Sequence, residues 1–403
     1  MKKLMILDNI VTTAMILIVL KYFSIIFQID FLDQIQNTLQ DFYVSDIVFS
    51  KIRNYDKIEV DTNIVLVNIG YLDRRGFARQ IDIINKYRPE VIGIDAFFRS
   101  DSGAIDEPLR RSLKRCKHLV MVSELKSFDP EMEKEHFDTL IRSNNKFSQY
   151  AHSGFANIII GSEDFRIARD FSPREMVGKT TVSAFPVTVT KLYNQTAYNN
   201  LIKRGNRNEK INYKRNINKY KTFDVIDVFR DAPELEALRG KIVLMGFLGP
   251  DLQTLVTEDN FFTPMNKQYV GKSYPDMYGI VIHANTISMI LEGSYIYKKP
   301  EWITIVFVVL LCYFNMWLYT YIRTHYETFY EPSSVTIVFI EMIILFLVII
   351  YSLQWLDVEL FDPMVTAVFF ALLITPMIYE LYHDSLKPLA ITYVKKFKRK
   401  RKK

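Results

Sequence analysis

The sequence contains very few cysteines. Cys116 and Cys312 are its two, and Cys312 lies in a long apolar run, so the two cannot pair with each other. A fold held together by disulfides is therefore excluded. The polar middle of the chain, roughly 270 residues, is long enough to bury a full hydrophobic core without a disulfide.

Charged residues are missing from long stretches near the C-terminus. Residues 302–322 carry no charge, residues 335–353 carry only Glu341, and residues 364–379 again carry none. A helix needs about 20 mostly apolar residues to cross about 30 Å of hydrocarbon. The sequence therefore predicts three membrane helices, the third of them extended to residues 362–382.

A cleavage site is missing after the first apolar run. Residues 10–29 follow a short basic start, but no small-x-small motif comes after them, which disfavours a removable signal peptide. Lys21 interrupts the run and can reach an interface or lie against another helix. Residues 10–29 are therefore predicted to be an uncleaved membrane anchor, and residues 1–9 a short cytoplasmic terminus.

The basic flanks predict the orientation of these four spans. Lys2 and Lys3 precede the first span, and a basic run, Lys395–Lys403, closes a tail of residues 383–403. Positive flanks stay in the cytoplasm, so both termini are expected there and residues 30–300 outside. This topology suits the inner membrane of a bacterium. Anionic lipid is the expected partner of the tail, with an acidic protein as the alternative.

The outer residues predict an α/β domain. β-Branched runs indicate strands, and apolar residues at helical spacing indicate helices. Strands alternating with helices imply a largely parallel sheet with flanking helices, here joined to four transmembrane helices. The expected strands are residues 63–70, 91–95, 118–122, 155–160 and 241–246; the expected helices are 30–55, continuing the first span, 74–87, 107–116 and 280–291, with 180–193 as either.

A basic segment interrupts this pattern. Residues 203–221 contain eight Lys or Arg, with only Glu209 opposing them. The expected topology places the segment outside the cytoplasm, which excludes nucleic acid as its partner. A solvated loop or hairpin is the favoured interpretation, and binding to an acidic partner or to lipid headgroups is the alternative.

Three motifs occur in order ahead of the apolar runs. They are Leu238–Gly246 (LRGKIVLMG), Asp259–Pro264 (DNFFTP) and Gly279–Ile287 (GIVIHANTI), and GIDAFF at Gly93–Phe98 precedes them. Together they resemble the second type of cyclase- and histidine-kinase-associated sensory extracellular domain, the CHASE-type-two family. The resemblance covers about residues 30–381 and implies an extracytoplasmic sensory domain followed by three membrane helices.

The chain departs from this family in three places. Val281 replaces the glutamate of the usual VEIHA motif, and Asp276–Gly279 (DMYG) replaces the usual MPG. Related proteins carry a cytoplasmic kinase or cyclase domain after the last span, whereas only about 20 mostly basic residues follow Tyr382 here. The resemblance therefore implies that a signal leaves through a separate polypeptide.

Ligands of α/β sheets gather at the carboxyl ends of the strands, which suggests a candidate ligand site. Each candidate also has an ordinary structural role: a helix cap for the first aspartate, a tight turn for the glycine, a turn for the threonine, and burial for the histidine. The candidates are Asp95, Gly246, Asp259, Thr263 and His283.

Catalytic and metal-binding patterns are missing. No Ser-His-Asp, Cys-His or metal-ligand spacing is present, and the glycines lack the spacing of a phosphate loop. We therefore expect no enzyme activity, no cofactor and no metal. Within the apolar runs, Glu341 and Asn315 are intramembrane polar candidates, either functional or simply hydrogen-bonded within the helix bundle.

Three functions fit these patterns. The leading hypothesis is a membrane-bound sensory or scaffold protein that relays the state of its outer domain to a separate signalling partner. The second is a non-signalling structural subunit of a cell-envelope complex, and the third, the least favoured, is an extracytoplasmic hydrolase. Association of the chain with copies of itself is compatible with each.

Overall fold

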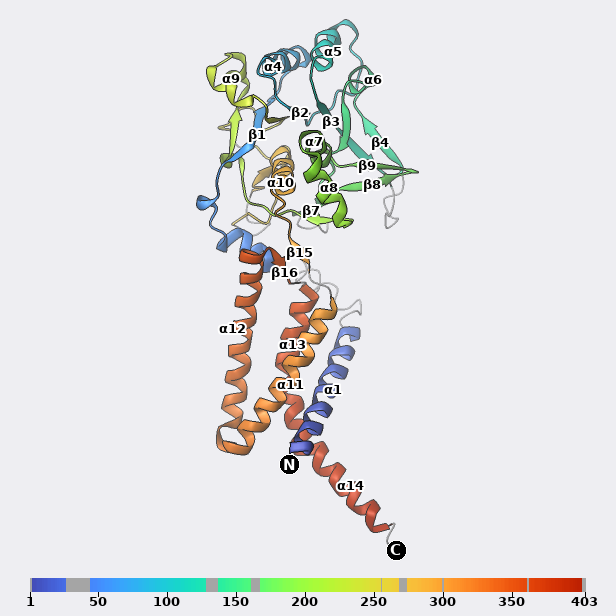
Figure 1. Cartoon of the computed structure of the whole chain (residues 1–403), viewed down its shortest axis with the longest axis vertical. Coiled ribbons are helices and arrows are strands. Elements are labelled where there is room, and N and C mark those ends of the chain that lie inside the picture. The colour runs from blue at the N-terminus through green and yellow to red at the C-terminus, as the bar shows by residue number, and fades with distance from the viewer. Residues whose placement is uncertain are drawn as a thin grey trace. The chain divides into compact units, whose positions relative to one another are not determined.

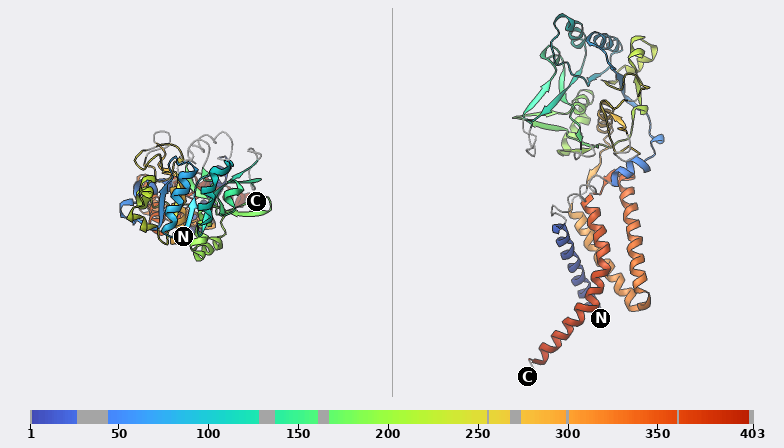
Figure 2. Two further views of the ribbon diagram at one scale, coloured as in Figure 1. Left: turned by 90° about the horizontal axis from the view of Figure 1, so that it is seen from above. Right: turned by 180° about the vertical axis from the view of Figure 1, so that it is seen from behind.

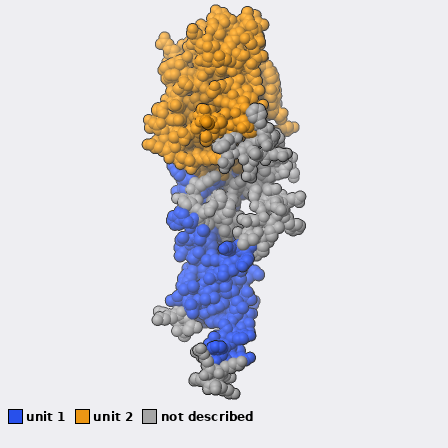
Figure 3. Space-filling model, turned by 90° about the vertical axis from the view of Figure 1, so that its right-hand side faces the viewer, with its two compact units in different colours: residues 1–48, 297–403 blue, residues 49–296 orange. Residues whose placement is uncertain are grey.

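The structure is a computed structural model of the whole chain. It describes residues 2–26, 44–127, 137–160, 167–254, 256–267, 274–298, 301–360 and 362–400. These form two compact units, one of residues 49–296 and one of residues 1–48 with 297–403 (Figure 3). The first is called the outer domain and the second the helical unit.

A seven-stranded sheet forms the centre of the outer domain. Its order is β11-β1-β12-β2-β3-β4, with β5 also paired to β3, and every pair is parallel except β3 with β4. The strands are β1 (Asp61–Asn68), β2 (Val91–Ile94), β3 (Leu119–Lys126), β4 (Thr139–Arg142), β5 (His152–Phe155), β11 (Tyr220–Phe223) and β12 (Ile242–Gly246). The predicted largely parallel sheet is confirmed.

Helices cover both faces of this sheet (Figures 1 and 2). On one face, alternate strand residues such as Val65, Ile92 and Val243 pack against apolar side chains of α4, α5 and α9. On the other face lie α7 and α10, and Phe185 of α7 lies close to Gly93 of β2. Burial on both faces explains why the strands are continuous apolar runs rather than alternating ones. The helices are α4 (Arg74–Lys86), α5 (Glu107–Lys114), α6 (Asn145–Ser148), α7 (Phe185–Tyr193), α8 (Gln195–Arg204), α9 (Val225–Phe229) and α10 (Gly279–Glu292).

Smaller sheets decorate the domain. Strands β10-β7-β6 form one, β8 and β9 form a hairpin, and β13 pairs antiparallel with β14. Their bounds are β6 (Ile159–Ile160), β7 (Ala168–Phe171), β8 (Arg174–Val177), β9 (Thr180–Ser183), β10 (Glu209–Lys210), β13 (Asn260–Phe261) and β14 (Met277–Tyr278). The stretch predicted as strand or helix over 180–193 is both, as β9 followed by α7.

Helices α1, α11, α12 and α13 of the helical unit lie side by side (Figures 1 and 2). They share a core that includes Ile16, Cys312, Val338 and Ala371. Strands β15 and β16 pair in parallel. The bounds are α1 (Lys2–Ile26), β15 (Tyr297–Lys298), α11 (Glu301–His325), α12 (Tyr330–Leu356), β16 (Val358–Glu359), α13 (Asp362–Glu380), the π-helix η8 (Leu381–Leu386) and α14 (Lys387–Lys400).

Two stretches of helix in the described residues are long and apolar enough to cross a membrane. They are Ile305–His325 and Glu327–Leu356, and they correspond to the runs predicted over 302–322 and 335–353. α1 and α13 cover most of the other two predicted spans, residues 10–29 and 362–382, and these two spans stay predictions. Two apolar helices thus indicate membrane association.

Two further predictions have different outcomes. The helix expected over residues 30–55 lies partly outside the described residues, while α3 (Val44–Ile47) and the π-helix η2 (Val48–Ile52) form short turns there. The expectation of a solvated loop over 203–221 is wrong for its middle. Ile211, Tyr213 and Arg215 are buried, because their partners come from distant parts of the chain.

Candidate functional site

The carboxyl ends of β1, β12 and β2 meet at one edge of the sheet. The buried side chain of Asn68, the last residue of β1, organises this edge. Its Nδ2 donates to the Gly249 carbonyl at 3.1 Å and to Asp224 Oδ1 at 3.0 Å, while its Oδ1 accepts from the N–H groups of Gly70 and Leu248 at 3.0 Å each. Since all four hydrogen-bonding positions are used, Asn68 fixes the loop after β12.

Two predicted aspartates lie close together at this edge. The backbone N–H of Asp95, just past β2, donates to the Met245 carbonyl at 2.8 Å, which places it beside the end of β12. Loss of hydration, followed by the negative charge of Asp259, raises the pKa of Asp95 to about 7. Loss of hydration and the charge of Glu258 raise the pKa of Asp259 to about 6. One carboxylate thus resists ionisation while the other is charged.

The first turn of α10 lies directly against the same edge. The N–H of Gly279 donates to the Asp259 carbonyl at 3.0 Å, and a Cβ at Gly279 would lie 3.1 Å from the Asp259 carboxylate. A Cβ at Gly246 would lie 2.8 Å from the Cβ of Ile280. Asp259 also has a φ of 52°, in the left-handed region that few residues other than glycine adopt. Asp95, Gly246 and Asp259 are therefore brought together at the beginning of α10.

Thr263 has a different setting. It is buried and lies just after β13, where its N–H and Oγ1 donate to the two carboxylate oxygens of Asp276 at 2.9 and 2.6 Å. Asp276 precedes β14, and its own N–H donates to the Phe261 carbonyl at 3.0 Å. The pair fixes the two ends of the connection between β13 and β14. The hydrogen bonds between Thr263 and Asp276 therefore give Thr263 a structural role.

His283 points away from the aspartates, toward α7. Its ring meets that of Phe185 edge-on, with centroids 5.2 Å apart. Burial lowers the pKa of His283 to about 4, so the imidazole is neutral near pH 7. It lines a cavity of about 10 Å³ with Asp170, Ser172 and Thr286. That volume is about what one water molecule requires, so the cavity is too small for an organic ligand.

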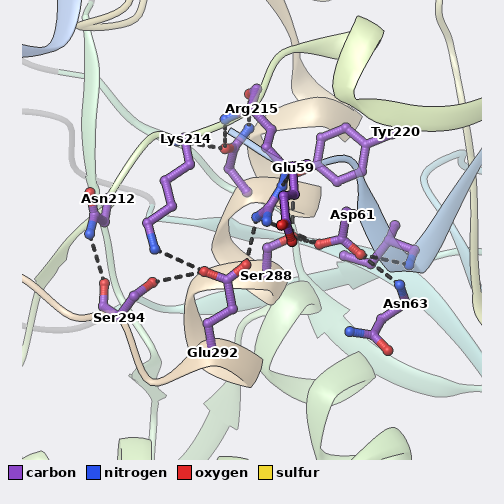
Figure 4. A network of polar contacts seen from close by, with 12 residues as sticks. Glu59, Asp61, Asn63, Asn212, Lys214, Arg215, Tyr220, Ser288, Glu292 and Ser294 are labelled. Atoms are coloured by element: carbon purple, nitrogen blue, oxygen red, sulfur yellow. Dashed lines mark hydrogen bonds and ion pairs between the residues drawn. The ribbon is translucent and has the colours of Figure 1, made fainter. Parts of the chain in front are cut away.

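The other end of α10 is held by an ion-pair network (Figure 4). Arg215 lies at its centre: Nη1 donates to Glu292 Oε1 at 2.7 Å and is 3.7 Å from Asp61 Oδ2, and Nε donates to the Glu59 carbonyl at 3.0 Å. Ser288 Oγ donates to Asp61 Oδ2 at 2.5 Å. This group, Glu59, Asp61, Arg215, Ser288 and Glu292, is called the Arg215 clamp.

Charge balance keeps the clamp ionised. Burial favours a neutral carboxyl at Glu292, but Lys214, 2.9 Å away, and Arg215 hold the pKa of Glu292 below its ordinary value. Asn285 of α10 accepts the backbone N–H groups of Lys214 and Arg215 at 3.3 and 3.1 Å, and it donates to the Arg215 carbonyl at 2.7 Å. A buried ion pair is tolerated when further hydrogen bonds satisfy its partners, as they do here.

The clamp joins the two places where the chain enters and leaves the outer domain. Glu59 and Asp61 stand at the beginning of β1, within a dozen residues of the boundary near residue 49, and Glu292 closes α10 four residues before the boundary at Ile296. Helix α10 therefore has the acidic edge at its first turn and the clamp at its last. At 1.5 Å per residue, its 14 residues span about 21 Å.

The two intramembrane candidates form a pair in the helical unit. Asn315 of α11 is fully buried, and its Nδ2 donates to Glu341 Oε2 of α12 at 3.1 Å. A polar pair of this kind joins two helices at one fixed register. For metals, the described residues hold no group of three His, Cys, Asp or Glu side chains placed to bind an ion.

The comparisons with known proteins decide the family. The model of the CHASE2 domain matches residues 11–320, more than three quarters of the chain. The chain belongs to the CHASE2 family. The searches of curated proteins and of solved structures found no match. The resemblance inferred from the three motifs is confirmed, and the CHASE2 domain is a sensory, extracellular one, in agreement with a sensory role for this chain.

The three sequence motifs that carry the resemblance lie together in this fold. The motif at Gly279–Ile287 is the first half of α10, whose Gly279 and Ile280 lie against Asp259 and Gly246 of the other two motifs. The clamp, in contrast, was not predicted. Arg215 was predicted to lie in a solvated loop, because its partners Asp61 and Glu292 lie far from it along the chain.

Proposed function

We propose that this CHASE2 protein spans the membrane four times, through α1, α11, α12 and α13, with the outer domain outside the cytoplasm and both termini inside. The apolar helices α11 and α12 support the proposal, and so does the core that all four helices share. The basic flanks at Lys2 and at Lys395–Lys403 favour this orientation. In a bacterial cell the corresponding membrane is the inner one.

Reporter fusions test this topology. A reporter inserted at Ser102, an exposed residue of the outer domain, and one fused after Lys403 should report opposite sides of the membrane. The same location for both would contradict four spans. A further fusion in the connection between α11 and α12, at Glu327, should report the cytoplasmic side, because that connection follows an even number of crossings.

The proposed activity is the relay of a change in the outer domain to a separate signalling protein. The observation that carries it is the position of α10, with a strained acidic edge at its first residue and the Arg215 clamp at its last. A ligand or proton that favours one arrangement of the edge over another shifts α10, and otherwise shifts nothing. The Arg215 clamp then moves the beginning of β1 and the end of α10 together, because it binds both.

An insertion after Gly293 tests the relay. About six Gly/Ser residues there should leave the outer domain folded, since Gly293 already ends α10 in the left-handed region (φ +66°). The insertion should uncouple the domain from the partner recovered with the protein from native membranes and identified by mass spectrometry. A matched insertion after Gly178, an exposed turn between β8 and β9, should leave the coupling intact.

The outcome separates the two main hypotheses. If the partner's output survives the insertion after Gly293, the connection is a tether, and a structural subunit of an envelope complex is the better account. A partner set of envelope-assembly proteins would point the same way, and a kinase or regulator would support the sensor. We propose no enzymatic role for the outer domain, and turnover of a hydrolase substrate by the purified protein would overturn that.

A further inference from the structure

Helix α14 has two unlike faces. Apolar residues recur every four positions at Leu389, Tyr393 and Phe397, and Val394 adjoins them on the same side. Lys395 lies on the opposite side of the helix, because 100° separates successive residues. The alternation is that of a basic amphipathic helix, a pattern typical of segments that lie on a membrane surface.

The apolar face is uncovered. Every residue from Pro388 to Phe397 is exposed, and the side chains of Leu389, Tyr393 and Phe397 are 56%, 72% and 63% exposed. No residue that the structure describes packs over this face. An exposed aromatic and aliphatic row of this length is unfavourable in water and marks an interaction surface.

The beginning of α14 is fixed to the N-terminal part of α1. Lys387 Nζ forms an ion pair with Asp8 Oδ2 at 2.5 Å, and Tyr382 Oη donates to Asp8 Oδ1 at 2.8 Å. Asp8 lies in the second turn of α1, next to the basic residues that the proposed topology places at the cytoplasmic surface. α14 therefore starts at the level where the hydrocarbon ends and the headgroups begin.

We infer that α14 lies in the cytoplasmic membrane–water interface, with Leu389, Tyr393 and Phe397 among the acyl chains and the lysines among anionic headgroups. The inference rests on the proposed topology. Burial of the apolar row holds such a helix in the interface, and each lysine near an anionic surface strengthens binding roughly fivefold. The adjacent bilayer and the positive charge favour lipid over an acidic protein groove as the occupant.

Spin labels on the full-length protein test this. In a background with Cys116→Ser and Cys312→Ala, single labels are placed by Tyr393→Cys, Phe397→Cys, Ile391→Cys and Phe339→Cys. Ile391 is the matched control, because it is exposed but lies on the basic side of the same helix. The protein is reconstituted in phosphatidylcholine vesicles with and without phosphatidylglycerol. The measured quantity is accessibility to oxygen, which enters lipid, against accessibility to a water-soluble nickel chelate.

With phosphatidylglycerol, the labels at positions 393 and 397 should be accessible to oxygen and protected from nickel, while the label at 391 stays in water. Lys395→Gln with Lys396→Gln should lower the bound-to-free ratio of the helix roughly 25-fold at low salt. Labels at 393 and 397 that stay in water in both lipids would overturn the inference. Equal protection without phosphatidylglycerol would overturn the role of anionic lipid.

Two further outcomes separate the causes of failure. Protection at 393 and 397 only in native membranes, and never in purified lipid, would overturn the inference in favour of an acidic protein partner. The label at Phe339, which is 64% exposed on α12, reports the topology itself. If it is accessible to oxygen while 393 and 397 are not, the membrane topology stands and the interfacial helix alone fails; if it too lies in water, the topology fails.

Discussion

The two ends of α10 differ in how their charges are satisfied. At its first turn, Asp95 and Asp259 approach each other, and burial with neighbouring negative charge raises the pKa of Asp95 to about 7 and that of Asp259 to about 6. At its last turn, Glu292 is paired with Lys214 and Arg215 and its pKa is lowered. The protonation of the carboxyl groups at the first turn of α10 is therefore sensitive to conditions near neutral pH, whereas the ion pairs at its last turn stay charged.

In the proposed relay, the two ends of α10 have separate tasks. A site that responds to a ligand or to protons has to be incompletely satisfied beforehand, because only then does binding change its free energy. An element that transmits a displacement has to be stiff, and a hydrogen-bonded ion pair at a helix end provides that stiffness. Substitutions at each end should therefore have effects of different kinds.

The largest effect is expected from Arg215→Met, which leaves the buried Asp61 and the half-buried Glu292 without their shared cation. The free energy of unfolding should fall by about 3–5 kcal/mol, the usual cost of removing one partner of a buried ion pair. Denaturant titration followed by hydrogen exchange in β1 and α10 measures this. Lys203→Met, an exposed residue of the same basic segment, should change stability by less than about 0.5 kcal/mol. Equal effects would refute the clamp.

Asp95→Asn should change how stability depends on pH. The pKa of Asp95 is about 7 in the folded state against 3.8 in its ordinary state, so the folded protein binds the extra proton between these values. Its contribution to stability is present below about pH 4 and is lost as pH rises through 7. The variant should therefore gain about 2–4 kcal/mol over the wild type between pH 4 and pH 8.

Thermal unfolding of both proteins across that pH range measures the gain. Asp251→Asn is the control, because hydrogen bonds from Gln253 and Thr254 lower the pKa of Asp251, so it titrates below this window. A difference between wild type and Asp95→Asn that does not change with pH would contradict the acidic edge.

Gly246→Ala should weaken the packing of α10 against the sheet. The new Cβ would lie 2.8 Å from the Cβ of Ile280, closer than real contacts allow, and overpacking of this kind costs about 1–3 kcal/mol. The double variant with Ile280→Ala should lose less than the sum of the two single changes, since alanine lacks the Cγ1 and Cδ1 atoms, two of the three that the new Cβ would contact. Strict additivity in denaturant titrations would show that α10 does not rest on this glycine.

The smallest effect on stability is expected from Gly293→Ala, for which Gly205→Ala is the matched control. Gly293 and Gly205 both end a helix in the left-handed region, at φ +66° and +69°, and neither would bring a Cβ into contact. Each alanine should therefore cost about 1–2 kcal/mol. Only Gly293→Ala, at the exit of the domain, should also alter the partner's output. If Gly205→Ala lowers both stability and the partner's output as much as Gly293→Ala does, the position of Gly293 at the end of the outer domain has no special role.

The local elements could be predicted from sequence because their residues carry the signal alone. The β-branched runs at Ile64–Ile69 and Ile242–Gly246, and the apolar helix closed by Gly293, are found where the pattern places them. The order of the strands could not be predicted. β12 inserts between β1 and β2, and nothing local in a strand about 150 residues downstream specifies its neighbours.

The candidate site could be predicted in part, for the same reason. Asp95, Gly246 and Asp259 meet because the ends of parallel strands share an edge, which is a general property of such sheets. Thr263 and His283 do not join them, since one finds a local partner in Asp276 and the other turns with the helix toward α7. Which side of α10 a residue faces depends on packing partners far away in sequence.

The short pairing of β15 with β16 has a mechanical consequence. Tyr297 follows directly on the last residue of the outer domain, and its N–H donates to the Asp357 carbonyl at 2.8 Å, at the turn between α12 and α13. Tyr297 is therefore connected to two helices: to α11 along the chain, and to the turn after α12 through the β15–β16 ladder. In the proposed relay, a displacement of this strand would therefore act on two neighbouring helices at once, α11 through the chain and α12 through the ladder.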